Sequence, residues 1–183
     1  MTAKVFVSVG TDHHPFDRLV GWADRWQQNT HRDAETYVQR GTSLVPPTVA
    51  SCEYLDKNDL DMRMAQASVV VCHGGPSTIM GARGAGARPI VVPRDHTRGE
   101  HVDGHQLAFC DHLERHGLVW RARSEAQLCA LIDDALTDPS LVRVDGEVQV
   151  GLLASTLEQF ELKVNGLLGR GPGGQRLNTS SRV

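Results

Sequence analysis

The chain has 183 residues, a formal net charge of −3 with histidine neutral, and 40% apolar and 22% charged residues. This length suits one domain, and the composition is ordinary for a soluble globular protein. Lysine and arginine form no basic block, so we expect no nucleic acid among the partners. No apolar run reaches the ~20 residues that a membrane-spanning helix needs.

The N-terminal residues and the cysteines indicate the cellular compartment of the protein. The first residues, 1–4, lead directly into a strand pattern rather than into the long apolar core of a signal peptide. The cysteines are widely spaced and form no CxxC pair: Cys52, Cys72, Cys110 and Cys129. This spacing favours a reducing cytoplasm over a disulfide framework.

The first third of the chain alternates strands and helices. A strand over 4–9 ends at Gly10-Thr11, and helical spacing of apolar residues predicts a helix from 15 or 16 to about 28. A strand over 35–39, a loop over 41–47 and a short strand over 51–55 follow. We expect Asn58 or Asp59 to cap a helix that ends near residue 67.

The stretch 68–106 carries the most informative pattern. Val69–Cys72 reads as a strand buried on both faces, and it stops at the turn His73-Gly74-Gly75. Pro76 suits the first position of a helix, where its missing N–H is not needed. Ser77 and Thr78 then add hydroxyls beside the free N–H groups of that helix start. Such a turn, with the positive end of a helix dipole, can hold a phosphate.

The remaining elements complete an alternating pattern. We predict a strand over 89–93, a polar loop from Arg94, a helix over 105–116 ended by Gly117, and a strand over 118–120. Ser124 should cap a helix over 125–137. A further amphipathic segment, 152–168, is predicted to be helical and to belong to one domain over 1–168. The Gly-, Arg- and Ser-rich residues 169–183 are predicted to be a disordered tail.

This alternation predicts an α/β fold with a Rossmann-like, doubly wound parallel sheet. Ligands of such sheets bind at the carboxyl ends of the strands. The segments Gly10-Thr11, 73–78 and 94–106 all follow predicted strands, so we expect them to converge at one edge of the sheet.

Several charged or titratable residues near that edge have two readings each. His13 and His14 can serve as a general base or as donors to a diphosphate, or they can be ordinary loop histidines. His73 can contact a ligand or hold the turn backbone. Arg94 can meet phosphate oxygens or lie in a solvated loop. His101 and His105 alternate with Asp103, but no second group of recognised spacing accompanies them, so we expect no metal site.

Three ordered motifs resemble the C-terminal, donor-binding half of family 28 glycosyltransferases, which is one half of a GT-B fold. More narrowly, they are similar to the stand-alone catalytic subunits of two-component enzymes, such as bacterial exopolysaccharide glycosyltransferase subunits and the eukaryotic dolichol-pathway N-acetylglucosaminyltransferase subunit. The resemblance spans about residues 4–137. Its motifs are VFVSVGT at 5–11 with FDRL at 16–19, HGGPSTIM at 73–80 with the strand at 89–94, and GEHVDGHQL at 99–107.

The resemblance implies an inverting transfer from a nucleoside-diphosphate sugar, usually UDP-linked, to a lipid-linked acceptor, without a cofactor or a tightly bound metal. It places Gly10, Thr11 and the backbone of residues 75–78 at the diphosphate, and the polar pair His105 and Gln106 at the sugar. It also implies a membrane-anchored partner subunit that supplies the acceptor side, which would hold the chain at the cytoplasmic face of the membrane.

One position departs from the family pattern. Many relatives have an acidic residue that holds the ribose hydroxyls where this chain has Gly81. A non-catalytic nucleotide-sugar-binding module of the same fold is therefore an alternative to the enzyme. A metal-dependent hydrolase that uses the histidines is a third reading.

Overall fold

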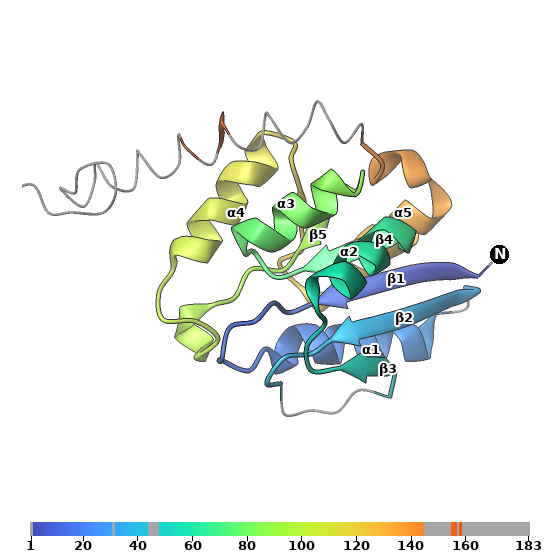
Figure 1. Ribbon diagram of the computed structural model, residues 1–183, viewed down its shortest axis with the longest axis horizontal. Helices are drawn as coiled ribbons and strands as arrows, with labels where there is room; N and C mark the ends of the chain where they lie inside the picture. Colours follow the sequence, from blue (N-terminus) through green and yellow to red (C-terminus); the bar gives the residue numbers. More distant parts are fainter. Residues whose placement is uncertain (1, 31, 44–47, 145–154, 157, 159–183) are drawn as a thin grey trace, which may run out of the picture.

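A six-stranded, entirely parallel sheet forms the centre of the protein in the computed structural model (Figure 1). The structure describes residues 2–30, 32–43, 48–144, 155, 156 and 158. The strand order is β3-β2-β1-β4-β5-β6, so the direction of winding reverses between β1 and β4. The strands are β1 (Ala3–Ser8), β2 (Ala34–Gln39), β3 (Ala50–Cys52), β4 (Val69–Cys72), β5 (Ile90–Val91) and β6 (Trp120–Arg121). The predicted doubly wound sheet is confirmed.

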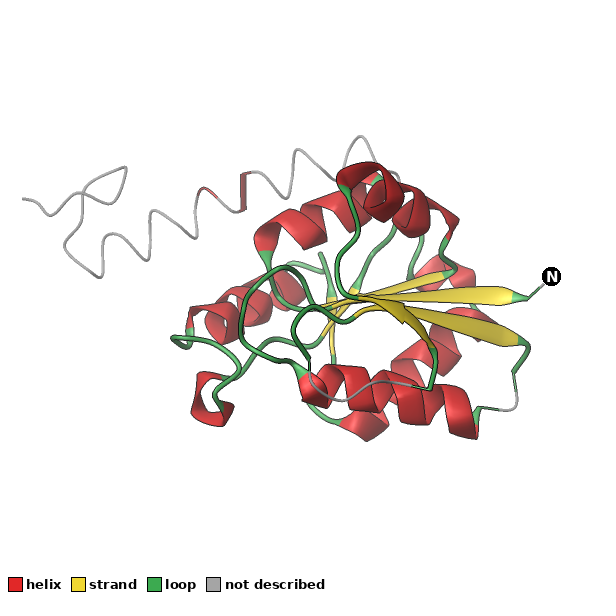
Figure 2. Cartoon of the chain, turned by 60° about the horizontal axis from the view of Figure 1, so that its bottom comes forward, coloured by secondary structure: helices red, strands yellow, loops and turns green. Residues whose placement is uncertain are grey.

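Helices cover both faces of this sheet (Figure 2). They are α1 (Asp17–Asn29), α2 (Lys57–Gln66), α3 (Pro76–Gly84), α4 (His105–Arg115) and α5 (Glu125–Thr137), with single 3₁₀ turns at His96–Arg98 and Pro139–Leu141. Side chains alternate along the strands, so Val69 and Val71 pack with α1 and α5, whereas Val70 packs with α2 and α3. Burial on both faces explains why β4 reads as an unbroken apolar run.

The helix ends agree with the sequence except at α2. Ser124 caps α5 as predicted, because its side chain accepts a hydrogen bond from the backbone N–H of Gln127. The predicted caps of α2, Asn58 and Asp59, are wrong. Asp56 caps this helix, accepting from the Asp59 N–H at 2.9 Å, so the helix begins earlier.

Three short segments also differ from expectation. The last strand covers Trp120–Arg121 rather than 118–120, because its ladder with β5 pairs Ile90 with Trp120 and Val91 with Arg121. The third strand covers Ala50–Cys52 rather than 51–55, because its ladder with β2 ends at the Gln39–Cys52 pair. The polar loop after β5 contains a 3₁₀ turn at His96–Arg98, which Asp95 caps through the Thr97 N–H.

The C-terminal predictions fall largely outside the described residues. Of the segment 152–168, residues 155, 156 and 158 are described, and they are helical. The extent of this helix and the tail over 169–183 stay predictions. Within the part of the chain that the structure describes, no helix combines the length and the apolar character needed to cross a membrane.

Candidate functional site

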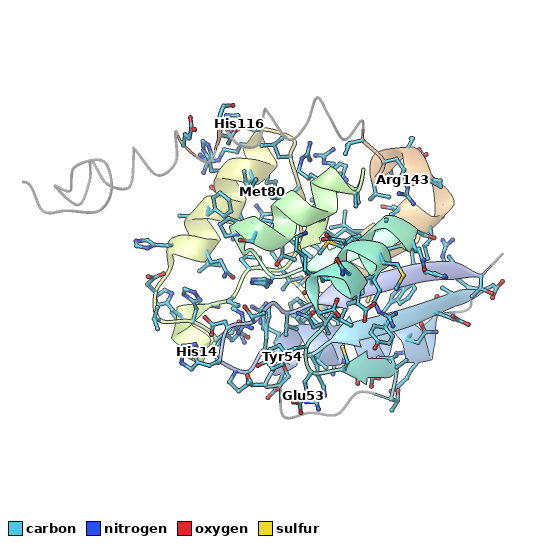
Figure 3. The ribbon with its side chains drawn as sticks, in the orientation of Figure 1. His14, Glu53, Tyr54, Met80, His116 and Arg143 are labelled. Atoms are coloured by element: carbon cyan, nitrogen blue, oxygen red, sulfur yellow. The ribbon has the colours of Figure 1, made fainter. Side chains whose placement is uncertain are left out.

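A pocket of about 450 Å³ lies at the carboxyl edge of the sheet, beside the reversal point between β1 and β4. The Gly10–Asp12 turn after β1 and the start of α3 form its walls, and Gln39, Leu60 and Gln106 add to the lining. Figure 3 shows His14 and Tyr54 on this side of the molecule, beyond the arrowheads of β1 and β2. All three segments expected to converge meet here, the third through its last residue, Gln106.

The His73 ring lies in contact with two glycines of this pocket. An ideal Cβ at Gly10 would lie 2.3 Å from His73 Cε1, and one at Gly75 would lie 2.2 Å from His73 Nε2. Gly10 also has a φ of +79°, in the left-handed region. The chain therefore needs glycine at both positions because the imidazole fills the space that a side chain would take.

His73 is a neutral side chain in this environment. Burial, and then the positive charge of Arg94, lower the pKa of His73 to about 4. Its backbone N–H donates to the Ser8 carbonyl at 3.0 Å, which ties the glycine turn to β1. Among the described residues its buried Nδ1 has no hydrogen-bond partner. The ring lines the pocket as a neutral group, so it contributes no charge to the site.

The start of α3 offers uncommitted backbone donors. Gly75 is the N-cap and Pro76 the first helical residue, and no side chain caps the helix. The first bond back to the cap runs from the Ile79 N–H to the Gly75 carbonyl at 3.1 Å, so the N–H groups of Ser77 and Thr78 stay unbonded within the described structure. The first turn carries no acidic residue. This is the arrangement that attracts a phosphate.

Asp12 and His14 form a hydrogen-bonded pair at the pocket. Asp12 Oδ1 accepts from the backbone N–H of His14 at 2.8 Å and lies 2.6 Å from His14 Nδ1. Burial acts to raise the pKa of Asp12, but these hydrogen bonds and the charge of Arg94 outweigh it, so the pKa is lowered. His101 Nε2 lies 3.9 Å from the other oxygen of the same carboxylate. An ionised Asp12 fixes the proton of His14 on Nδ1 and leaves its Nε2 as an acceptor.

The polar pair at the start of α4 is divided between pocket and solvent. Gln106 lines the pocket, and its Oε1 accepts from the Arg94 N–H at 2.9 Å, which assigns the amide orientation. The side-chain nitrogen of Gln106 makes no hydrogen bond to another described residue. His105 is 60% exposed, pairs with Asp103 at 3.3 Å and does not line the pocket.

Arg94 has a structural position instead of the expected contact with phosphate. Its side chain is fully buried, and its guanidinium donates to the backbone carbonyls of Val9, His14 and Glu100 at 2.9, 2.7 and 3.0 Å. These bonds hold the loop after β5 against the turn after β1. The predicted phosphate contact is therefore corrected, since Arg94 does not line the pocket.

Three other predicted residues also lie away from the pocket lining. One is His14, which is hydrogen-bonded to the lining residue Asp12 without lining the pocket itself. The side chain of His13 is 83% exposed. An ideal Cβ at Gly74 would lie 2.3 Å from Cys110 Sγ, so this glycine allows α4 to pack against the turn. The remaining predicted residues of the turn, Gly75 to Thr78, do line the pocket, as do Gly10 and Thr11.

Gly81 lies at the position where the family resemblance implies an acidic residue that holds the ribose hydroxyls. Its Cα faces α2, because an ideal Cβ there would lie 3.3 Å from Met64 Sδ. Gly81 is not part of the pocket lining. The Cβ of any other residue at this position would therefore point toward α2.

Four lining residues were not among the predicted site residues: Ser8, Asp12, Gln39 and Leu60. Ser8 and Gln39 are the last residues of β1 and β2, so the rule that ligands bind at carboxyl strand ends points to them. Asp12 is marked by its spacing from His14, since aspartate commonly accepts from the N–H two residues later. Leu60 carries no sequence signal that we recognise.

Asp12, His13 and His14 also offer ligand atoms that lie within 4.8 Å of one another. The hydrogen bond between Asp12 and His14 already uses two of these atoms, and His13 is exposed. The expectation of no metal here stays a prediction.

A doubly wound parallel sheet with a glycine turn and a helix N-terminus at its reversal point defines a Rossmann-like α/β domain. The model of the glycosyltransferase family 28 C-terminal domain matches residues 5–144, and the chain belongs to this family.

Solved structures with the same fold are glycosyltransferases. The kitacinnamycin glycosyltransferase aligns with a TM-score of 0.59 at 17% identity, over 92% of this chain and 43% of that one. The calicheamicin glycosyltransferase CalG4 gives 0.54 at 15%, over 92% and 44%. MurG of Acinetobacter baumannii gives 0.57 at 14%, over 88% and 49%. These identities show the fold alone, and the chain spans less than half the length of each. No curated protein matches the chain.

Proposed function

We propose that the chain is the donor-binding catalytic subunit of an inverting glycosyltransferase that moves a sugar from a nucleoside-diphosphate sugar, UDP-linked, to a lipid-linked acceptor. The observation that carries the proposal is the start of α3, where the unbonded N–H groups of Ser77 and Thr78 adjoin a pocket of about 450 Å³. Membership of the glycosyltransferase family supports the same reading.

The donor diphosphate is the group that this pocket suits. One further negative charge develops on it as the bond to the sugar breaks, and the backbone donors and dipole of α3 stabilise that charge. The neutral His73 beside Gly75 lines the pocket without adding a charge that would hold the product. The side-chain nitrogen of Gln106 is available to a hydroxyl of the sugar.

His14 is the proposed general base. Asp12 holds its Nδ1 at 2.6 Å, so Nε2 can take the proton of the acceptor hydroxyl. The hydroxyl oxygen then forms a bond to the anomeric carbon from the side opposite the diphosphate. The bond from that carbon to the diphosphate breaks, its electron pair leaves with UDP, and the configuration inverts.

The acceptor side is assigned to a membrane-anchored partner subunit. The motif resemblance to stand-alone catalytic subunits supports this assignment, and the chain spans 43% and 49% of the length of two matched glycosyltransferases. With its partner, the chain would work at the cytoplasmic face of the membrane. Transfer should be poor with the purified chain and restored by co-expression with the partner. Robust transfer by the chain alone to a soluble acceptor would refute the two-subunit assignment.

Calorimetric titration with UDP tests the donor site, with two variants of one exposed residue. Ser77→Asp places a carboxylate in the first turn of α3, which should raise helix stability by about 0.3–1 kcal/mol. The same carboxylate repels a diphosphate, so UDP affinity should fall about tenfold or more. Ser77→Asn is the neutral control and should bind UDP nearly as well as the parent chain. Equal affinity in all three proteins would contradict the proposed site.

The non-catalytic alternative has its own outcome in these assays. UDP binding without sugar transfer or donor hydrolysis, with every candidate partner present, would favour a nucleotide-sugar-binding module over an enzyme.

A further inference from the structure

A second, smaller pocket lies at the carboxyl ends of β5 and β6 and has a cationic lining. Its volume is about 120 Å³. The charged residues in the lining are one aspartate, Asp95, and four arginines: Arg18, Arg98, Arg121 and Arg123. The arginines come from α1, from the loop after β5 and from β6 and the turn that follows it.

The carboxylates that pair with three of these arginines lie outside the lining. Glu100 binds Arg18 at 2.8 and 2.6 Å, and Glu114 binds Arg123 at 3.0 and 2.6 Å. Arg121 donates to one oxygen of Asp111 at 3.1 Å. Each carboxylate covers one edge of a guanidinium group. It fixes the orientation of that group and leaves other N–H donors unused.

Arg121 is the one of the four arginines with a buried guanidinium nitrogen, its Nε, that lacks a hydrogen-bond partner among the described residues. Its side chain is 13% exposed. Burial, and then the positive charge of Arg123, lower the pKa of Arg121. A cation that is both buried and beside a like charge is stabilised by an anion.

This pocket is separate from the donor pocket, although both open at the same edge of the sheet. The neighbouring residues Gln106 and Leu107, in the first turn of α4, line the first and the second pocket respectively. The loop after β5 runs between them, held by the bidentate pair of Arg18 and Glu100.

We propose that the arginine-lined pocket binds a phosphate group. Guanidinium groups match the oxygen geometry of phosphate through paired N–H donors, and four of them converge here. A single water molecule needs about 10–15 Å³ of cavity volume. The pocket volume of 120 Å³ therefore accommodates the five heavy atoms of a phosphate. The phosphate belongs to a lipid headgroup or to a small soluble phosphate, and the two sources share this chemistry.

Amide chemical shifts during a titration with inorganic phosphate test the site. Ser77→Asp is the background, so that the donor pocket does not compete for the anion. The largest shifts should fall on residues 95–98 and 121–123. Arg98→Gln should weaken this binding about tenfold, since it removes one charged hydrogen-bond donor. Arg98 is 63% exposed, so the variant should fold.

Arg32→Gln is the matched control. It removes an arginine that is 39% exposed, paired with Asp133 at 3.1 Å and absent from the pocket lining. It should leave phosphate binding unchanged. Equal binding by Arg98→Gln and Arg32→Gln, or shifts no larger than those that chloride causes, would overturn the proposal. Because the donor pocket is blocked in the background protein, this result is independent of the UDP titration.

Flotation with phosphatidylcholine vesicles, with or without phosphatidic acid, distinguishes the two sources. Binding only to vesicles with phosphatidic acid, reduced by Arg98→Gln and not by Arg32→Gln, would support a lipid headgroup. Saturable binding of inorganic phosphate without vesicle binding would support a soluble phosphate. Failure of both probes would refute the site.

Discussion

The imidazole of His73 occupies the space that a side chain at Gly75 would need, since an ideal Cβ there would lie 2.2 Å from His73 Nε2. Gly75 has an ordinary φ of −77°, so the conflict is steric rather than conformational. We expect Gly75→Ala to lower the free energy of unfolding by about 1–3 kcal/mol, as overpacking does. Urea denaturation measures the change.

Gly84→Ala is the control on the same helix, because an ideal Cβ at Gly84 meets nothing within 4 Å. It should stabilise the protein by about 0.5–1 kcal/mol through helix propensity. In a His73→Ala background the cost of Gly75→Ala should largely disappear. A cost that persists there would show that His73 is not the cause.

The pH dependence of stability should carry a signature of His73. Its pKa is about 4 in the folded protein against about 6.5 in an unfolded chain. Between these values the unfolded chain binds the extra proton, so stability is complete above pH ~6.5 and is lost as the pH falls toward 4. The loss from this group should reach about 3 kcal/mol.

Denaturation curves at several pH values between 4.5 and 7 test this origin in the parent chain and in His73→Asn. The variant has no titrating group at this position, so its stability should change less over the interval. Parallel pH profiles for the two proteins would assign the loss to other groups.

Glu100 ties the loop after β5 to α1. Its carboxylate accepts two hydrogen bonds from Arg18 and one, at 2.9 Å, from the backbone N–H of Asp95. The carboxyl side chain is 8% exposed, so Glu100→Gln should cost about 3 kcal/mol and should speed hydrogen exchange at the Asp95 amide.

The pair of Arg25 and Glu125 serves as the comparison for that loop contact. It is also bidentate, but its side chains are 51% and 37% exposed. Glu125→Gln should therefore cost less than about 1 kcal/mol. Equal costs for the two glutamine variants would contradict the structural role assigned to Glu100.

Single substitutions test whether His14, rather than the adjacent His13, is the general base. Asp12→Ala removes the acceptor that keeps the proton on His14 Nδ1, and His14→Gln removes the base itself. With the partner subunit present, each should lower the rate constant of transfer by about 10²–10⁴. UDP affinity, measured by calorimetry, should change much less.

His13→Gln is the control for this experiment, because the His13 side chain is 83% exposed and lies 3.9 Å from Asp12, whereas His14 is hydrogen-bonded to Asp12. It should leave the transfer rate within about twofold of the parent value. A loss of rate in His13→Gln, with His14→Gln unaffected, would move the base to the other histidine.

The spacing of apolar residues and the alternation of strands and helices are what make the fold predictable from the sequence. The apolar run of β4 and the glycine turn after it place the start of α3 at the reversal point without any structure. The α2 cap was missed because Asp56, Asn58 and Asp59 are all good N-caps, and only the backbone decides among them.

Side-chain direction explains what the sequence did not predict about the site. Arg94 follows a strand at the correct edge, but its guanidinium turns inward to three backbone carbonyls. His105 and Gln106 are neighbours on one helix turn, which points them in different directions, and only Gln106 lines the pocket. Spacing along the chain identifies the edge, whereas packing decides which side chains reach the ligand.

The most direct test of the account compares amide chemical shifts of the ¹⁵N-labelled chain titrated with UDP and with uridine. The account predicts that UDP causes large, saturable shifts at the amides of Gly75, Ser77 and Thr78, and that uridine, which has no phosphate, does not. UDP shifts confined to the arginine-lined pocket, or equal shifts with uridine, would contradict a diphosphate site at the start of α3.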